Sequence, residues 1–211
     1  MTDSIRFTDR CINKGLQYLE KPLQIYWPAK IDSSGRLNPV AENNIALHLA
    51  RSFTEAGFLV WAEIPSSAGH KRLDFFAYCD TENIAVALEL KRSIDMPPSG
   101  SREDLKKLAD LHYSAGLANA DAAINSAEWI YGIVTVLYAN AFVTWWENPE
   151  GYDYEQSGRY LRSADYKKIG QGIAKAHRNV VPLGKWDNIA AAYALYDKNS
   201  IAELKMVMER A

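Results

Sequence analysis

The chain is poor in the residues that build disulfide frameworks, zinc sites and membrane spans. Its two cysteines, Cys11 and Cys79, form neither a disulfide framework nor a zinc motif, so a reducing cytoplasm is the expected compartment. Residues 1–10 are polar and no apolar run follows them, so no N-terminal signal sequence is expected. The long uncharged window at 129–146 is broken by Asn140 and is rich in Ile, Val, Thr and Tyr. These features favour two buried strands joined near that asparagine over a membrane span.

An excess of charge of one sign is also missing. There are 24 Lys and Arg residues against 26 Asp and Glu residues, which gives a formal net charge of −2 and a pI near 6.1. This balance argues against a protein that coats nucleic acid with a uniformly basic surface, so contact with phosphate should be local. The sequence contains no Gly-rich phosphate loop, nucleophile elbow or His-rich metal motif. No motif therefore supports the alternative that the protein is an enzyme acting on sugars or small metabolites on another α/β fold.

The most informative stretch is a predicted β-hairpin. Two runs at 71–79 and 84–93 are rich in aromatic and aliphatic residues, and the polar tetrad 80–83 separates them. Centring the turn between the two middle residues of the tetrad predicts a register with three notable pairs. These pairs are Cys79 with Ile84, Asp74 with Glu89, and Arg72 with Lys91.

The charged residues of this hairpin should lie close together. Side chains alternate along a strand, so Glu89 and Lys91 share a face, and Asp74 joins them from the neighbouring strand. Strand 84–90 is otherwise apolar on both faces, which is typical of a covered central strand, and two opposed carboxylates are costly there. A divalent cation with oxygen ligands would offset that cost. The alternative is that the Asp, Glu and Lys side chains only pair with one another.

These residues resemble the motif of a known enzyme family. Asp74, followed by Glu89-Leu90-Lys91 on the next apolar strand, is similar to the D…(D/E)xK pattern of the PD-(D/E)xK nuclease superfamily, with Leu73 in place of the family's proline. The resemblance covers about residues 39–138. It implies an α/β protein with a restriction-endonuclease-like α-β-β-β-α-β core, in which a mixed central sheet is flanked by helices. We expect a single domain over 1–211, with a core at about 39–138, an N-terminal helical addition at 1–38, and a C-terminal strand, loop and helices at 139–211.

The same resemblance implies a Mg²⁺-dependent endonuclease or exonuclease, with DNA as the favoured substrate and Mn²⁺ as a substitute metal. Asp74, Glu89 and the main-chain carbonyl of Leu90 would bind the metal, which polarises the phosphate and acidifies water. Lys91 would orient that water and stabilise charge on the phosphate oxygens. A homodimer or a larger nuclease complex is the expected assembly. The alternative is a nuclease-fold nucleic-acid-binding or accessory module that needs a partner or has lost catalysis.

Two acids outside the hairpin are candidates to support the metal. A helix predicted over 38–57, with Asn-Pro at its start and Gly at its end, carries Glu42 one turn before its apolar stripe. That stripe consists of Ile45, Leu49 and Phe53. The resemblance implies that Glu42 points at the site, and the alternative is a first-turn acid favoured by the helix dipole. Glu63 lies near the end of a strand predicted at 58–64, and its alternative is a solvent-facing edge position.

Further elements are predicted on both sides of this region. A helix at 9–21 would be capped by Thr8, and a crossover helix would run from Ser101 to about residue 117 with a buried stripe of leucines at 105, 108 and 111. The strand that follows, at 129–138, should run parallel to strand 84–90. A strand at 142–146 and helices at 186–196 and 201–208 are predicted after it.

Basic and aromatic residues provide candidate contacts to nucleic acid. The basic candidates are His70, Lys71, Arg72, Arg102 and Lys106, and a solvated basic turn is the alternative. A second basic stretch lies at 167–178. The candidates for stacking on bases are Trp145, Trp146, Tyr152, Tyr154 and Tyr160, and the alternative is that they belong to the core.

Overall fold

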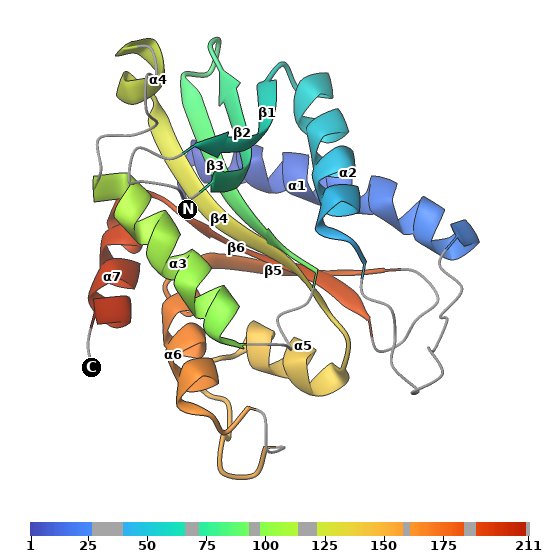
Figure 1. Ribbon diagram of the computed structural model, residues 1–211, viewed down its shortest axis with the longest axis vertical. Helices are drawn as coiled ribbons and strands as arrows, with labels where there is room; N and C mark the ends of the chain where they lie inside the picture. The colour runs from blue at the N-terminus through green and yellow to red at the C-terminus, as the bar shows by residue number, and fades with distance from the viewer. Residues whose placement is uncertain are drawn as a thin grey trace.

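A six-stranded mixed sheet forms the centre of the protein, in the order β1-β2-β3-β4-β6-β5 (Figure 1). The computed structural model describes residues 1–26, 40–65, 72–92, 98–113, 122–157, 161–183 and 189–209. The strands are β1 (Leu59–Pro65), β2 (Arg72–Cys79), β3 (Ile84–Lys91), β4 (Glu128–Leu137), β5 (His177–Pro182) and β6 (Ala190–Tyr196). The pair β3–β4 is parallel, as predicted, and the other four pairs are antiparallel.

Helices cover both faces of this sheet. One face carries α1 (Asp3–Tyr26) and α2 (Glu42–Glu55), and the other carries α3 (Pro98–Tyr113), α5 (Asn140–Glu147), α6 (Ala164–Ile173) and α7 (Lys198–Glu209). The short α4 (Ala122–Ser126) precedes β4. The prediction of an α/β protein with a mixed sheet between helices is therefore confirmed. Within the described ranges, no helix is long and apolar enough to cross a membrane.

The predicted hairpin is present as β2 and β3. Residues 80–83 form its turn, and the paired residues run from Cys79 and Ile84 to Phe75 and Leu88, which confirms the predicted register over this part of the hairpin. The predicted pairs Asp74–Glu89 and Arg72–Lys91 lie beyond the last pair of the described ladder. Strand β3 is buried on both faces. Its even-numbered residues pack toward α1 and α2, while Ala85 and Ala87 pack toward α3. The strand is thus held rigidly between two layers, as expected for a central strand.

Helix α2 ends as predicted but begins later. Gly57 follows the helix with a φ of +90°, a conformation that glycine adopts without steric cost. The first helical residue is Glu42, after an extended Ala41, and not the predicted Asn38-Pro39, which lie outside the described residues. The N–H of the buried Val40 donates to the Tyr138 hydroxyl at 2.7 Å.

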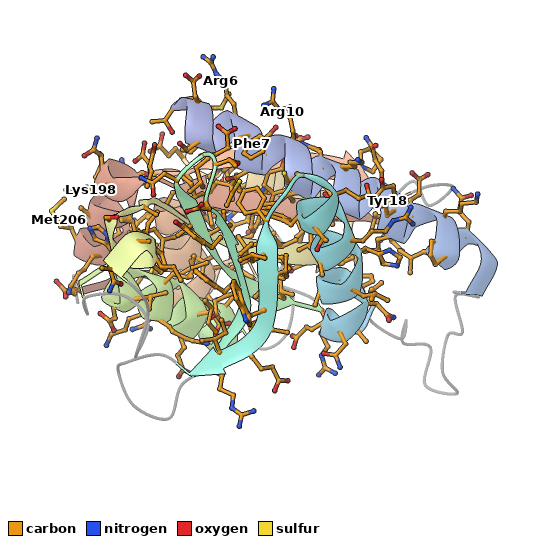
Figure 2. All side chains as sticks on the ribbon, turned by 90° about the horizontal axis from the view of Figure 1, so that it is seen from above. Arg6, Phe7, Arg10, Tyr18, Lys198 and Met206 are labelled. Carbon is orange, nitrogen blue, oxygen red and sulfur yellow. The ribbon has the colours of Figure 1, made fainter. Side chains whose placement is uncertain are left out.

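Helix α1 is longer than the predicted 9–21. It is capped by Thr2, whose Oγ1 accepts a hydrogen bond from the N–H of Ile5 at 3.2 Å, while the predicted cap Thr8 is buried inside the helix. The helix continues through Pro22 because Leu23, beyond the proline, is still buried in the core. Arg6 and Arg10 point away from the sheet, as Figure 2 shows.

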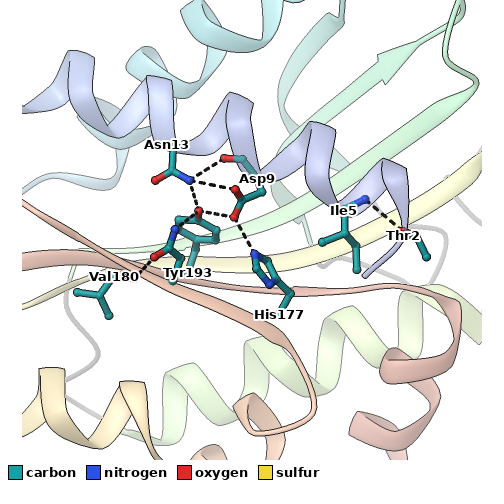
Figure 3. A network of polar contacts seen from close by, with 8 residues as sticks. Thr2, Ile5, Asp9, Asn13, His177, Val180 and Tyr193 are labelled. Atoms are coloured by element: carbon teal, nitrogen blue, oxygen red, sulfur yellow. Dashed lines mark hydrogen bonds and ion pairs between the residues drawn. The ribbon is translucent and has the colours of Figure 1, made fainter.

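A polar network ties α1 to the far edge of the sheet (Figure 3). Asp9 Oδ1 lies 2.8 Å from His177 Nε2 and accepts a hydrogen bond from the Tyr193 hydroxyl at 2.7 Å. Asn179 donates to the same hydroxyl at 3.0 Å, and Asn13 donates to both Asp9 and Tyr193. His177 of the predicted basic stretch is therefore engaged in anchoring α1 on β5 and β6.

The buried face of helix α3 agrees with the prediction. Leu105, Leu108 and Leu111 are buried as expected. The helix begins at Pro98, so Ser101 lies inside it and is buried instead of acting as its cap. The predicted end near residue 117 lies outside the described residues.

Two elements after β4 have the opposite type to the prediction. The segment predicted as a strand at 142–146 lies in α5. The adjacent Trp145 and Trp146 both pack in the same core cluster, whereas a strand would turn them to opposite faces. The segment predicted as a helix at 186–196 contains β6, and residues 184–188 are outside the described part. Strand β6 lies between β4 and β5, where backbone pairing on both edges outweighs the helix propensity of its alanines. The predicted helix at 201–208 is confirmed as α7.

The start of α7 gives a testable cap. Asp197 Oδ1 accepts hydrogen bonds from the N–H groups of Asn199 and Ser200 at 3.0 and 2.9 Å, and the Asp197 N–H donates to Ser200 Oγ at 2.9 Å. Asp197→Ala should lower the free energy of unfolding by about 1 kcal/mol at pH 7. Burial acts to raise the pKa of Asp197, but the hydrogen bonds from Ser200 and Asn199 outweigh it and lower the pKa.

A carboxylate with a lowered folded-state pKa stabilises the protein above its unfolded pKa, and this contribution is lost as the pH falls through the folded value. The difference between wild type and Asp197→Ala should therefore be constant from pH 5 to 8 and shrink below about pH 4. Urea unfolding at each pH measures it. A difference that persists unchanged at pH 3 would contradict the charged cap.

Candidate active site

Charged side chains from β2, β3 and α3 meet at the carboxyl end of β3. Glu89 is 1% exposed, and its Oε1 lies 2.7 Å from Nζ of Lys107. Lys91, two residues further along β3, places its Nζ 2.7 Å from Oδ2 of Asp104. The structure therefore supplies partners from α3, rather than the pairing within the hairpin that the sequence left open.

Strand and helix geometry explain this arrangement. Ala85 and Ala87 face α3, so alternation brings Glu89 and Lys91 to the same side. Asp104 and Lys107 are three residues apart on α3, a spacing that makes them neighbours on the helix surface. One helix thus presents a carboxylate and an ammonium group to a strand that presents the complementary pair.

Asp74 is positioned by a break in the alternation of β2. Leu73 packs on the α3 side and Phe75 on the opposite side, although both are odd-numbered. The described β2–β3 pairing ends at Phe75 and Leu88, and the Leu90 N–H donates to Asp74 Oδ2 at 2.9 Å. The side chain of Asp74 therefore replaces a ladder acceptor and is fixed beside β3.

The adjoining edge strand has a matching irregularity. Glu63 of β1 has a φ of +54°, a conformation that is uncommon for a residue with a side chain. The residues on either side of it pair with Phe75 and Leu73, so Glu63 and Asp74 occupy the same level of the sheet. Its carboxylate is nevertheless 66% exposed and forms a 3.0 Å ion pair with Arg72. The structure does not bring this acid into the buried cluster.

Glu42 is brought close to the cluster from the other helical layer. Its Oε1 accepts a hydrogen bond from the Arg92 N–H at 3.2 Å, and its charge acts on Lys91. The first residue of α2 thus lies at the end of β3. The structure supports its placement near the site more directly than that of Glu63.

Burial and mutual repulsion change the protonation of these groups. Burial, followed by the charge of Asp74, raises the pKa of Glu89 to about 9, against the opposing effect of Lys107. Burial also raises the pKa of Asp104. For Lys91, burial acts to lower the pKa, but the contact with Asp104 and the nearby carboxylates outweigh it and raise the pKa. At neutral pH Lys91 is therefore a cation.

The donor set fits a divalent cation by charge and chemistry. Asp74, Glu89, Asp104 and Glu42 provide four carboxylates against the two ammonium groups of the cluster, a formal excess of two negative charges. Carboxylate oxygens are the ligands that Mg²⁺ prefers. No group of three or more His, Cys, Asp or Glu side chains is arranged to hold a metal among the described residues. A metal would therefore bind Asp74 and Glu89 only after the ion pairs of the cluster rearrange.

The predicted basic contacts are dispersed. Arg72 is exposed and paired with Glu63, and Arg102 forms a 2.9 Å ion pair with Asp165. Lys106 is exposed on α3, next to the buried face that carries Lys107. His70 and Lys71 lie outside the described residues. Arg72 adjoins the cluster, because its carbonyl accepts a hydrogen bond from Lys107, whereas Arg102 is paired with α6.

Two of the five predicted stacking aromatics are not available to bases. Trp145 and Trp146 are 0% exposed, so stacking is excluded for both and the alternative of a core position is confirmed. Tyr152 and Tyr154 are half-buried and contact each other edge to face at 5.3 Å. Tyr160 lies outside the described residues.

The sequence patterns did not identify Asp104 and Lys107 as site residues. Asp104 lies four residues before Leu108 and seven before Leu111, so it is aligned with the buried stripe of α3. An acid in that position could have been found by the same reasoning that selected Glu42. Lys107 gave no comparable signal, because a lysine in a charged segment is usually solvated.

Comparison with protein-family models, curated proteins and solved structures finds no match for this chain. The residues gathered at the carboxyl end of β3 are therefore the basis for a functional assignment.

Proposed function

We propose that this protein is a metal-dependent nuclease of the PD-(D/E)xK type, with a restriction-endonuclease-like core and with DNA as the favoured substrate. The observation that carries the proposal is the burial of Glu89 beside Asp74, with Lys91 two residues further along the same strand. Burial of an ionisable side chain such as Glu89 on a central strand lowers the stability of the fold. Such a residue is therefore a candidate for a functional role. The element order α2-β1-β2-β3-α3-β4, with α4 inserted before β4, also agrees with the core that the motif implies.

Each residue has a defined role in this proposal. Asp74 and Glu89, with the main-chain carbonyl of Leu90, would hold Mg²⁺, which supplies Lewis-acid polarisation of the phosphate and an acidified water when bound. Lys91, cationic at neutral pH, orients the attacking water and stabilises negative charge on the phosphate oxygens. Glu42 supports the site from α2 through its contact with the main chain of Arg92.

The buried setting strengthens these effects. Glu89 is almost fully enclosed, and the side chains of Lys91 and Lys107 are 24% and 14% exposed. Electrostatic interactions in such a setting are screened less than in water. Arg72 and Lys106 at the rim are suited to local phosphate contact, in agreement with the nearly neutral net charge.

The closed ion pairs favour a second candidate function. Lys91 is held by Asp104 and Glu89 by Lys107, so the charges of the cluster already stabilise one another. Such a cluster is compatible with an accessory or nucleic-acid-binding module that uses the fold without cleaving. A partner would then supply substrate recognition or catalysis.

A cleavage time course separates the two functions. Supercoiled, linear duplex, single-stranded and branched DNA and RNA are incubated with Mg²⁺ or Mn²⁺ and the wild type, Asp74→Asn or Glu89→Gln. We expect cleavage of at least one DNA substrate by the wild type and a loss of at least about 100-fold in both variants. Glu103→Gln, which changes an exposed acid next to Asp104 on α3, should retain the wild-type rate.

Equal rates in wild type and Asp74→Asn would refute the nuclease. Absence of cleavage on every substrate, together with DNA binding that does not need metal, would favour the accessory module.

A further inference from the structure

Lys107 is an unusual lysine for the surface of a helix. Its side chain is only 14% exposed, and its Nζ lies 2.7 Å from the buried Glu89 Oε1. The same ammonium group donates a hydrogen bond to the main-chain carbonyl of Arg72 on β2. Lys107 therefore spans from α3 to two neighbouring strands, at the acid expected to bind a metal.

A lysine and a divalent cation cannot both lie close to Glu89 without strong repulsion. Two positive charges a few ångströms apart repel by several kcal/mol even at the effective dielectric constant of a protein interior. Entry of a metal at Glu89 therefore requires Lys107 to withdraw. Its long, flexible side chain allows this without movement of α3.

A new partner for Lys107 is already on the same helix. Asp104 lies three residues before it, within reach of an ion pair along the helix surface. Asp104 currently holds Lys91 at 2.7 Å. If the ammonium group of Lys107 takes the place of Lys91 at Asp104 Oδ2, Lys91 loses its partner and is released toward the site.

We propose that Lys107 is a built-in counter-ion that occupies the place of the metal at Glu89 and, when a divalent cation displaces it to Asp104, releases Lys91 for catalysis. This inference rests on the proposed metal site. Lys107 and Asp104 are positioning residues in it: they decide when the cation site is open and when Lys91 is free.

Mn²⁺ binding tests the exchange without any nucleic acid. The full chain is titrated with Mn²⁺ as wild type, Lys107→Met, Glu89→Gln and the control Lys198→Met, which changes an exposed lysine at the start of α7. We expect Lys107→Met to bind Mn²⁺ at least about tenfold more tightly than wild type, because the competing ammonium group is gone. Lys198→Met should bind like the wild type, and Glu89→Gln should bind more weakly.

Thermal unfolding gives a second readout of the same role. Metal-free Lys107→Met should melt below wild type, because a buried acid has lost its cation, and saturating Mn²⁺ should remove most of that difference. A merely structural lysine would leave the variant destabilised with or without metal.

The wild type itself provides a test that does not depend on folding of a variant. Covalent labelling of lysines, measured by mass spectrometry, should show Lys91 several times more reactive with Mn²⁺ than without it, since its ion pair with Asp104 is broken. Unchanged labelling of Lys91 under saturating Mn²⁺ would overturn the exchange.

The outcomes distinguish this inference from the proposed function. Equal Mn²⁺ affinities for wild type and Lys107→Met, with weaker binding by Glu89→Gln, would overturn the role of Lys107 and leave the metal site standing. Absence of Mn²⁺ binding in every protein would overturn both.

Discussion

Lys91→Ala is expected to lower the rate of metal-dependent cleavage by about 100- to 1,000-fold, the range measured when one preorganised stabilising group is removed from an active site. Lys91 is the cation that follows the metal-binding acid on β3, and it is not proposed as a metal ligand. Affinity for Mn²⁺ should therefore change little. Single-turnover cleavage of the best substrate and a Mn²⁺ titration measure the two quantities separately.

Two further variants sharpen this prediction. Lys198→Ala changes an exposed lysine at the start of α7 and should cleave at the wild-type rate. Lys91→Arg keeps the charge but changes its geometry, so it should recover only part of the lost rate. A cleavage rate for Lys91→Ala close to that of wild type would show that this lysine serves only as the partner of Asp104.

Trp145→Ala is expected to lower the free energy of unfolding by about 3–5 kcal/mol, as found for large aromatic residues removed from a core. The side chain is 0% exposed and contacts Tyr166 and Trp146 edge to face, with ring centroids 5.6 and 6.1 Å away. Its Nε1 also donates to the Tyr154 hydroxyl at 2.9 Å. Urea unfolding measures the loss.

The conservative change Trp145→Phe should cost less than Trp145→Ala, because it removes the hydrogen bond and part of the volume but retains an aromatic ring. Phe142→Ala, at a half-buried position of the same helix, serves as a matched control and should also cost less. A loss below about 1 kcal/mol in Trp145→Ala would contradict the burial of this residue in α5 and leave it available as a stacking surface.

These two predictions concern different halves of the molecule. The catalytic group lies on β3, which is paired on both edges and covered on both faces, so its position is rigid. Its partners lie on α3, whose leucine stripe packs on the sheet. A site built between a central strand and a packed helix can rearrange its side chains without movement of the backbone. This property is what the proposed exchange between Lys107 and a metal requires.

Local chemistry was sufficient to predict the hairpin and its neighbours. The polar tetrad 80–83 set the turn, and the turn alone defined the register that pairs Cys79 with Ile84 and Phe75 with Leu88. Gly57 predicted the end of α2 because its positive φ suits glycine. The leucine stripe of α3 followed from helical periodicity. In each case the decisive interactions connect residues that are close in sequence or related by a simple repeat.

The sequence by itself therefore determined β2, β3, their register and the presence of Asp74, Glu89 and Lys91 at one end of the central strand. Only the tertiary structure decided that the alanine-rich segment 190–196 is a strand, since its conformation depends on pairing with β4 and β5. It also decided which lysine faces Glu89, because Lys107 is brought there by the packing of α3 against the sheet. Contacts between distant parts of the chain supply the free energy for both, and such contacts leave no periodic pattern in the sequence.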